Sequence, residues 1–174
     1  MNYLQELWAA LDFGSLRNIL LRLASVFLCL TTHETCHGLA AYALGDPTAK
    51  VNGRLTLNPI AHIDWIGLFL LLVAGVGWAK PVPVDMRNFR RPKRDMAITA
   101  LAGPVSNFLL ALIALGIGSL LLHFGPEGLV TAYALLFFCQ LALVSVGLGL
   151  FNLIPVPPLD GSRLLSACLP DNAY

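Results

Sequence analysis

His33-Glu34-Thr35-Cys36-His37 lies inside an apolar segment that extends from about Leu16 to Leu44. Roughly 20 apolar residues cross a bilayer core of about 30 Å, so this segment is long enough to span a membrane. Residues four apart share one face of a helix, which places the imidazoles of His33 and His37 together, with Glu34 beside them. This pattern predicts two ligands for one zinc ion and a general base. The alternative, two ordinary histidines in a buried helix, is costly inside hydrocarbon without a metal.

The composition indicates an integral membrane protein. Of 174 residues, 57% are hydrophobic and 12% are charged, whereas charged residues make up about 25% of a typical soluble domain. A net charge of +1, with no basic surface interleaved with aromatic residues, argues against a nucleic-acid partner. The four cysteines stand singly in or beside apolar segments, so we expect buried thiols and no disulfide framework. We therefore expect the partners to be the lipid bilayer and proteins embedded in it.

Three other segments complete the predicted membrane part. Two are apolar and long enough to span, from about Met96 to Leu122 and from about Leu129 to Phe151, and the short link between them predicts antiparallel neighbours. Trp65 to Trp78 gives only about 21 Å of helix at 1.5 Å per residue, which favours a re-entrant or interfacial helix over a span. The basic loop from Lys80 to Asp95 is typical of the cytoplasmic side.

Residues Ala49 to Leu57 differ in character, because they partly alternate between polar and apolar side chains. They contain Asn52-Gly53, the dipeptide that favours a two-residue I′ turn. We predict a small membrane-associated β-hairpin in this segment. A two-stranded hairpin is marginal by itself, so we expect it to lean on the helices.

Asp160 is the candidate for the third zinc ligand, since a catalytic zinc site uses three protein ligands and a water. An aspartate at the end of a span is costly near lipid unless it has a metal or a partner. The alternative is that Asp160 caps a short helix from about Ser162 to Leu169. If residues 65–78 do not cross the membrane, the chain returns Asp160 to the same cytoplasmic side as His37 and places the N-terminus outside. If they cross, the two residues lie on opposite sides.

Three motifs occur in order along the chain: His33-Glu34-x-x-His37, Ala102-Gly103-Pro104-x-x-Asn107, and Asn152-x-x-Pro155-x-Pro157-x-Leu159-Asp160-Gly161. Together they resemble the site-2 protease family of intramembrane zinc metalloproteases (peptidase family M50). The resemblance covers about residues 16 to 165. Stretches such as Leu55–Asp64 and Gly77–Val84 are similar to those of the compact prokaryotic branch that lacks a PDZ domain.

The resemblance implies an all-α polytopic membrane protein with a three-helix transmembrane catalytic core, in which residues 1–174 form one membrane-embedded domain. Members of that branch usually continue with at least one further apolar helix, which leaves open a C-terminal truncation at Tyr174. The implied activity is that of a zinc endopeptidase, with one Zn²⁺ per chain, that cleaves transmembrane segments of other membrane proteins in a prokaryotic cell membrane. Its active site is expected toward the cytoplasm.

Substrate contacts are expected at two further places. Asn107, Asn152 and His62 are candidates for holding substrate backbone or an oxyanion. The alternatives are an interhelical hydrogen bond for Asn107 and a structural or solvated role for His62. A substrate helix has to unwind before cleavage, and its freed backbone needs partners in a medium without water. Strand addition on the predicted hairpin offers them, through Val51, Asn52, Gly53, Arg54 and Leu55.

Two other functions remain open at this stage. An ion or metal transporter also uses buried histidine, glutamate and aspartate side chains, although transport does not require the H-E-x-x-H spacing. A non-catalytic membrane binding protein that retains zinc is the other alternative. The Glu34→Gln change separates them from a peptidase, because it removes the base without removing a zinc ligand.

Overall fold

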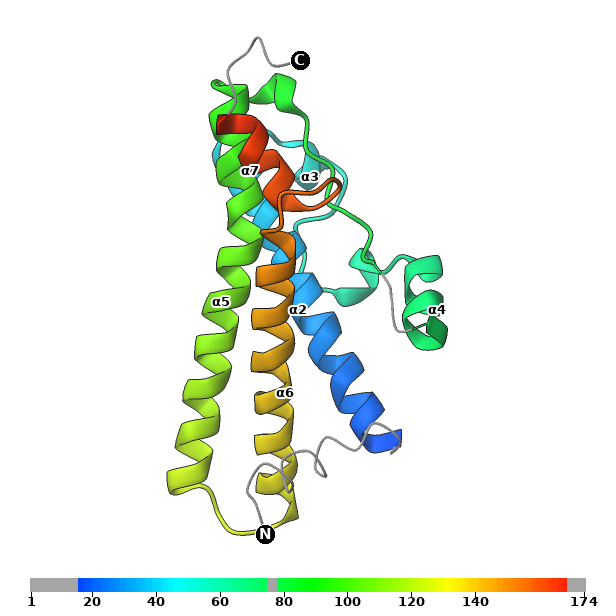
Figure 1. The fold of residues 1–174 in the computed structure, drawn as a ribbon, viewed down its shortest axis with the longest axis vertical. Helices are drawn as coiled ribbons and strands as arrows, with labels where there is room; N and C mark the ends of the chain where they lie inside the picture. Colours follow the sequence, from blue (N-terminus) through cyan, green and yellow to red (C-terminus); the bar gives the residue numbers. More distant parts are fainter. Residues whose placement is uncertain (1–15, 75–77, 169–174) are drawn as a thin grey trace.

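Three long helices form the body of the molecule (Figure 1). The computed structural model describes residues 16–74 and 78–168. Within these residues, α2 (Leu16–Ala43), α5 (Pro92–Phe124) and α6 (Leu129–Asn152) are each long and apolar enough to cross a membrane. The predicted all-helical, three-span membrane core is therefore confirmed.

The three helices alternate in direction along the long axis of the molecule (Figure 1). The short link after Phe124 makes α5 and α6 antiparallel neighbours, and α2 packs against both of them. The two ends of the bundle therefore differ. One end gathers α3 (Thr48–Val51), the loop before α5, and α7 (Asp160–Cys168), which packs against α5. This arrangement returns Asp160 to the C-terminal half of α2.

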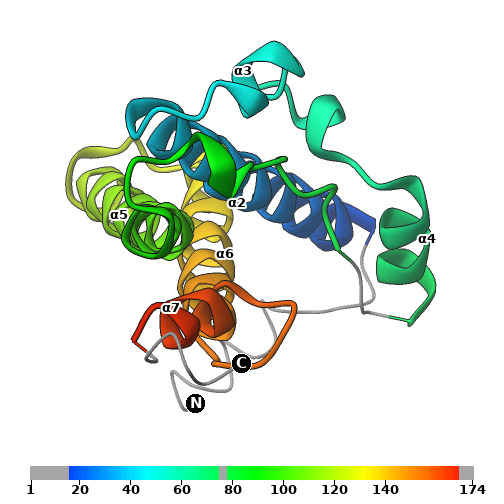
Figure 2. The same cartoon turned by 90° about the horizontal axis from the view of Figure 1, so that it is seen from above.

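The short helix α4 (Trp65–Ala74) stands away from the three long helices (Figure 2). Its 10 residues give about 15 Å at 1.5 Å per residue, half of a bilayer core. The carboxylate of Asp64 begins the helix by accepting the N–H groups of Ile66 and Gly67, at 3.0 and 2.9 Å. The structure thus contains the short, non-spanning helix that the sequence predicts. Residues 75–77 of the predicted segment lie outside the described residues.

The predicted β-hairpin at Ala49 to Leu57 is wrong. Residues Thr48–Val51 form the single helical turn α3, and Asn52-Gly53 ends it. Asn52 has a φ of −81°, whereas an I′ turn needs a positive φ at both central residues. Only Gly53 is left-handed, at +65°, and it closes a Schellman motif in which the N–H of Arg54 reaches the carbonyl of Ala49 at 2.8 Å.

The predicted strand edge for substrate docking falls with the hairpin. In the described part of the chain, β-pairing is limited to one isolated antiparallel bridge, between Ile63 and Ala79. The residues proposed for docking instead form the end of α3, its cap and the loop that follows: Val51, Asn52, Gly53, Arg54 and Leu55. Leu55 turns back onto α2, where a Cβ added at Gly38 would lie 2.6 Å from its Cδ2.

A buried carboxylate explains why this segment folds back as a helix. Asp46 is 0% exposed, and its Oδ1 accepts hydrogen bonds from the backbone and the hydroxyl of Thr48 and from the amide of Asn88. Its Oδ2 accepts the N–H of Asp85 at 2.8 Å. Burial by itself raises the pKa of Asp46, but these bonds more than offset it, so the pKa lies below its usual value. The contacts tie α3 and the 3₁₀ turn η2 (Met86–Asn88) to the end of α2.

Small side chains form the buried centre of the bundle. The cluster brings α2, α5 and α6 together through Cys29, Ala111, Ala114, Leu141 and Ala142. Small residues allow helix backbones to approach closely, which supports packing where lipid is as apolar as the protein. Larger apolar side chains on the same helices face outward, among them Leu112 and Val130. These outward residues suit a lipid-facing surface.

Candidate metal centre

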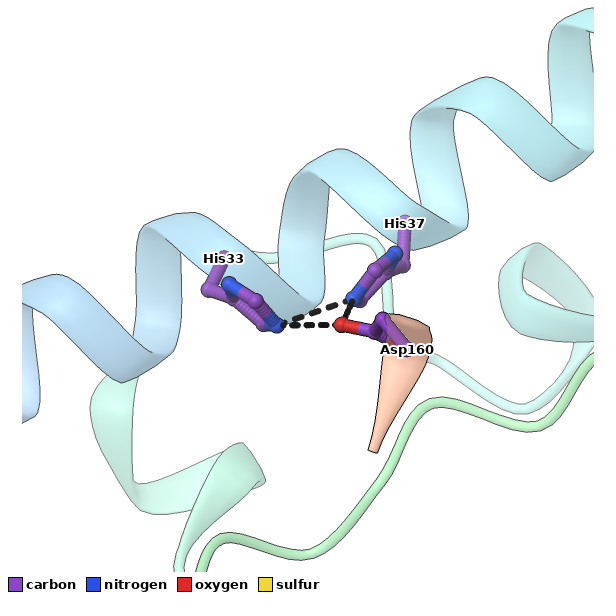
Figure 3. A group of neighbouring side chains, drawn as sticks. All are labelled: His33, His37 and Asp160. Atoms are coloured by element: carbon purple, nitrogen blue, oxygen red, sulfur yellow. Dashed lines mark hydrogen bonds and ion pairs between the residues drawn. The ribbon is translucent and has the colours of Figure 1, made fainter. Parts of the chain in front are cut away.

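The side chains of His33, His37 and Asp160 meet at one point (Figure 3). Both histidines come from α2, one helical turn apart, and Asp160 is the first residue of α7. The Nε2 atoms of the two imidazoles lie 2.9 Å apart. The Oδ2 of Asp160 lies 3.1 Å from Nε2 of His33 and 3.0 Å from Nε2 of His37. The sequence prediction that these three residues come together agrees with this geometry.

This donor set fits a zinc ion. Ligands about 2.0 to 2.1 Å from a tetrahedral zinc stand about 3.3 Å from one another, close to the separations found here. The imidazole rings are nearly perpendicular, at 88°, and each places its Nε2 atom at the shared point. All three residues are buried, and three electron-pair donors facing one another in a buried site call for a cation between them.

The second nitrogen of His37 is held in a way that suits metal binding. Its Nδ1 lies 2.7 Å from the carbonyl oxygen of Thr99 on α5. A carbonyl only accepts, so Nδ1 carries the proton, and Nε2 of the neutral ring keeps its lone pair for the metal. Orientation of a ligating histidine by a backbone carbonyl is a recurrent feature of zinc sites.

Asn107 plays the corresponding part for His33. The amide nitrogen of Asn107 lies 3.1 Å from Nδ1 of His33, while its Oδ1 is buried and has no hydrogen-bond partner. Turning the amide by 180° exchanges the two atoms, and Oδ1 then accepts the Nδ1–H that a zinc-binding His33 carries. The interhelical hydrogen bond considered for Asn107 is therefore present, and it ends on a member of the histidine pair.

Gly103 belongs to the second sequence motif, but the sequence prediction did not include it among the site residues. A Cβ atom there would lie 2.4 Å from Nε2 of His37 and 2.6 Å from Cε1 of His33. The α5 backbone approaches both imidazoles so closely that no side chain fits between them. A signal was present in the sequence, since Gly103 stands four residues before Asn107 and so shares its face of α5.

Glu34 is held by a backbone group. Its Oε2 accepts the N–H of Val82 at 2.9 Å, from the extended segment that leads from Trp78 to Val84. That segment is fixed on either side of Val82, because the N–H of Lys80 binds the carbonyl of His62 and the N–H of Asp85 binds Asp46. With Oε2 engaged, Oε1 remains for other contacts.

Two other predicted substrate contacts bind backbone carbonyls. Asn152 donates to the carbonyl of Leu148 within α6, at 3.0 Å. His62, at the end of the 3₁₀ turn η1 (Pro59–His62), is 2% exposed, and its Nε2 lies 2.9 Å from the carbonyl of Thr56. The same carbonyl accepts the hydroxyl of Thr35, so the carbonyl of Thr56 links His62 to a residue inside the His33–His37 motif.

Comparison with known proteins identifies relatives among metalloproteases. The chain is 44% identical over 148 residues to "Putative zinc metalloprotease YwhC" of Bacillus subtilis, which covers 84% of this chain and 68% of that protein. It is 30% identical over 147 residues to "Putative zinc metalloprotease Rip2" of Mycolicibacterium smegmatis, covering 82% of this chain and 54% of the relative. A shorter match of 71 residues, at 46% identity, joins 41% of this chain to 25% of "Protease RseP" of Photorhabdus luminescens.

The family profile named Peptidase family M50 matches residues 121–172, which include the end of α5, all of α6 and α7. No solved structure matched the chain. The chain spans about two thirds of YwhC and about half of Rip2. From the extent of the YwhC match, together with the M50 profile, the chain belongs to peptidase family M50, the site-2 protease family of zinc metalloproteases.

Proposed function

We propose that this chain is an intramembrane endopeptidase, which hydrolyses peptide bonds in or near transmembrane segments of other membrane proteins. The observation that carries the proposal is that two potential zinc ligands on α2, a helix long and apolar enough to span a membrane, meet a third, Asp160, at the start of α7. His37 lies six residues before the end of α2 at Ala43, about 9 Å along the helix axis. This position of the two histidines inside a candidate span supports a substrate that is itself embedded in the membrane.

In this proposal His33, His37 and Asp160 hold one zinc ion. When bound there, zinc supplies Lewis acidity that polarises the scissile carbonyl and brings the pKa of the attacking water to about 7. Thr99 and Asn107 fix the two imidazoles in the orientation that binding requires.

Glu34 acts as the general base. Its carboxylate takes a proton from the attacking water and later delivers it to the leaving amine. The N–H of Val82 fixes Oε2, so the carboxylate keeps one orientation while Oε1 handles the proton. Proximity of a positioned base to the reacting water is worth roughly 10² to 10⁴ in rate.

The proposed orientation places the active site toward the cytoplasm of a prokaryotic cell. Figure 1 shows the loop that leads into α5 at the same end of the bundle as α7. Between α4 and the first turn of α5 the sequence concentrates basic side chains: Lys80, Arg87, Arg90, Arg91, Lys93 and Arg94. Such clusters stay on the cytoplasmic side of a membrane. The start of α2 is then extracytoplasmic.

The decisive experiment compares the wild type with Glu34→Gln in lipid vesicles. Zinc content is measured by elemental analysis, and cleavage is followed with a model transmembrane peptide. We expect one zinc per chain in both proteins and a loss of cleavage of at least about 100-fold in the variant. Glu127→Gln makes the same chemical change in the exposed link between α5 and α6 and should cleave like the wild type.

Either of two results would overturn the proposal. Stoichiometric zinc would be absent from the purified wild-type protein, or Glu34→Gln would cleave as fast as Glu127→Gln. A transport function predicts a different outcome. Zinc or another ion would cross the vesicle membrane, and neither the wild type nor the two variants would cleave the peptide.

A further inference from the structure

A cavity of about 320 Å³ lies on the side of α2 that faces α6 and the η1 turn. Phe27 and Thr31 line it from α2, Gly147 and Leu148 from α6, and His62 from η1. Its walls are mainly apolar, and its volume is at the lower end of the range in which small ligands bind. The cavity is separate from the group of three zinc-type ligands, none of which lines it.

The cavity leads toward Glu34 along two walls. On α2, Phe27 and Thr31 lie seven and three residues before Glu34 and therefore share its face of the helix. On the opposite wall, Ala79 lines the cavity and lies three residues before Val82, which donates to Glu34. Two walls of the cavity therefore continue into the segments that hold the proposed base, although Glu34 itself does not line the cavity.

His62 presents an unused hydrogen-bond acceptor in this apolar setting. Its Nε2 is 2.9 Å from the carbonyl of Thr56 and so carries the proton. The other nitrogen, Nδ1, then bears a lone pair, is buried, and has no partner. A buried acceptor without a partner costs about 1 to 3 kcal/mol, which a donor on an occupant would recover.

The other ionisable group that lines the cavity is Asp64. It is also an acceptor, and its Oδ1 is already engaged by the N–H groups of Ile66 and Gly67. Few side chains on the walls carry a donor: besides the His62 Nε2–H that binds Thr56, these are the hydroxyl of Thr31 and the indole N–H of Trp78. The wall chemistry favours an occupant that is apolar and brings its own donor.

We propose that this cavity is a substrate side-chain pocket, selective for an aromatic residue that carries a hydrogen-bond donor, and that His62 Nδ1 accepts that bond. Tyrosine meets the requirement, with an apolar ring and one hydroxyl. The pocket rests on the proposed peptidase function and specifies one side chain of its substrate. A site built around a hydrogen bond discriminates against the analogue that lacks the donor.

Gly147 gives a means of closing the pocket without disturbing the fold. A Cβ added at Gly147 meets no atom within 4 Å, although the residue lines the cavity. A leucine there therefore extends into open space, and Gly147 also borders a second apolar cavity, lined by α5 and α6. Gly116 on α5 is the matched control, because a Cβ at this position also meets nothing within 4 Å, and Gly116 does not line the cavity.

The experiment measures binding of model transmembrane peptides to zinc-loaded Glu34→Gln protein in phosphatidylcholine vesicles. The peptides differ only by Phe or Tyr at one position, which is scanned along the segment. At one position we expect Tyr to bind roughly three- to tenfold more tightly than Phe, the worth of one hydrogen bond. His62→Gln, whose amide still reaches the carbonyl of Thr56 but offers no acceptor at the place of Nδ1, should remove this difference.

The pocket-filling change Gly147→Leu should weaken binding of both aromatic peptides relative to an alanine peptide, while Gly116→Leu should bind like the parent. Zinc content and thermal unfolding of each variant report whether it has folded. Equal binding of Tyr and Phe at every position, or a Tyr preference that persists in His62→Gln, overturns the pocket. A His62-dependent preference without cleavage by the wild type supports the pocket and refutes the peptidase; cleavage that needs Glu34 but shows no preference does the reverse.

Discussion

Gly103 on α5 lies against α2, Gly147 on α6 lines the cavity beside α2, and the space around the two glycines is opposite in kind. A methyl group at Gly103 would collide with both zinc-type histidines, whereas one at Gly147 would meet nothing. On the α5 side of α2, the packing leaves room only for the hydrogen atom of Gly103. The same side holds the imidazoles by hydrogen bonds, in which the carbonyl of Thr99 accepts from His37 and the amide of Asn107 pairs with His33. The α6 side leaves a cavity of about 320 Å³.

The difference separates two tasks along one helix. Metal binding and proton transfer need atoms fixed to within a fraction of an ångström, so α5 clamps the histidines by close backbone approach. Substrate recognition needs space that a side chain of another protein can enter. The single helix α2 meets both needs, because the two tasks use different faces of it.

The largest expected effect comes from breaking the tight side. Gly103→Ala places a methyl group on the imidazoles of His33 and His37, so zinc binding weakens and cleavage falls by about 100-fold or more. Elemental analysis and peptide cleavage measure the two losses. Gly116→Ala on the same helix has open space around it and should behave like the wild type. Full zinc occupancy in Gly103→Ala would contradict the close contact.

The second prediction concerns the hydrogen bond from α5 to His33. Asn107→Leu removes the amide next to Nδ1 and should weaken zinc affinity by roughly 10- to 100-fold, the usual effect of losing a partner of a metal-binding histidine. Competition with a chelator measures the affinity. Asn107→Asp keeps an acceptor and should lose less. Asn152→Leu serves as a control for zinc affinity alone, since its amide binds only within α6.

The hydrogen bonds of Asp46, which hold the loop that contacts Glu34, should make the stability of the protein depend on pH in the acidic range. Asp46→Asn turns one end of the side chain into a donor that faces other donors, which should cost about 1 to 3 kcal/mol of unfolding free energy. The pKa of Asp46 is lowered in the fold. Its stabilising contribution is therefore complete above the unfolded pKa of about 3.9 and is lost as the pH falls through the folded pKa.

Thermal unfolding in detergent from pH 7 to pH 3 tests this expectation. The wild type should lose stability below about pH 4, and Asp46→Asn should lose less over the same interval, starting from a lower value. Asp85→Asn removes an exposed pair with Arg87 but leaves the N–H of residue 85 in place, so its effect at pH 7 should be smaller. Parallel pH profiles for wild type and Asp46→Asn would contradict the role given to this carboxylate.

The smallest effect is expected on the open side. Gly147→Ala introduces a methyl group without a contact, and alanine favours a helix over glycine by up to about 1 kcal/mol. Its melting temperature should therefore equal or slightly exceed that of the wild type. A clear loss of stability would show that the α6 face of α2 is packed as tightly as the α5 face.

Much of the fold followed from patterns that a sequence displays directly. The three spans are long apolar segments, and the side on which Asp160 emerges depends only on whether residues 65–78 cross. The hairpin prediction failed because Asn-Gly serves equally in an I′ turn and at the end of a helix. What decides between them is the side chain of Asp46, which captures Thr48, and the contact of Leu55 with α2.

The need for glycine at position 103 could not be predicted from the sequence, for a related reason. The glycine alone reads as a place where helices approach, and nothing in its own helix says what lies opposite. The reason for its small size is the pair of imidazoles on α2, sixty-six and seventy residues earlier in the chain. Long-range contacts of this kind are set by the packed fold.

The segment Pro81-Val82-Pro83 fixes how the chain aligns with the proposed base. Proline has no N–H, so Val82 offers the only backbone donor among these three residues, and that donor binds Glu34. A slip of one residue in either direction would place a proline opposite the carboxylate and leave it without a bond. Only one alignment of this segment therefore supplies a hydrogen bond to Glu34. Because the donor belongs to the backbone, any side chain at position 82 except proline preserves it, which makes this contact insensitive to most mutations.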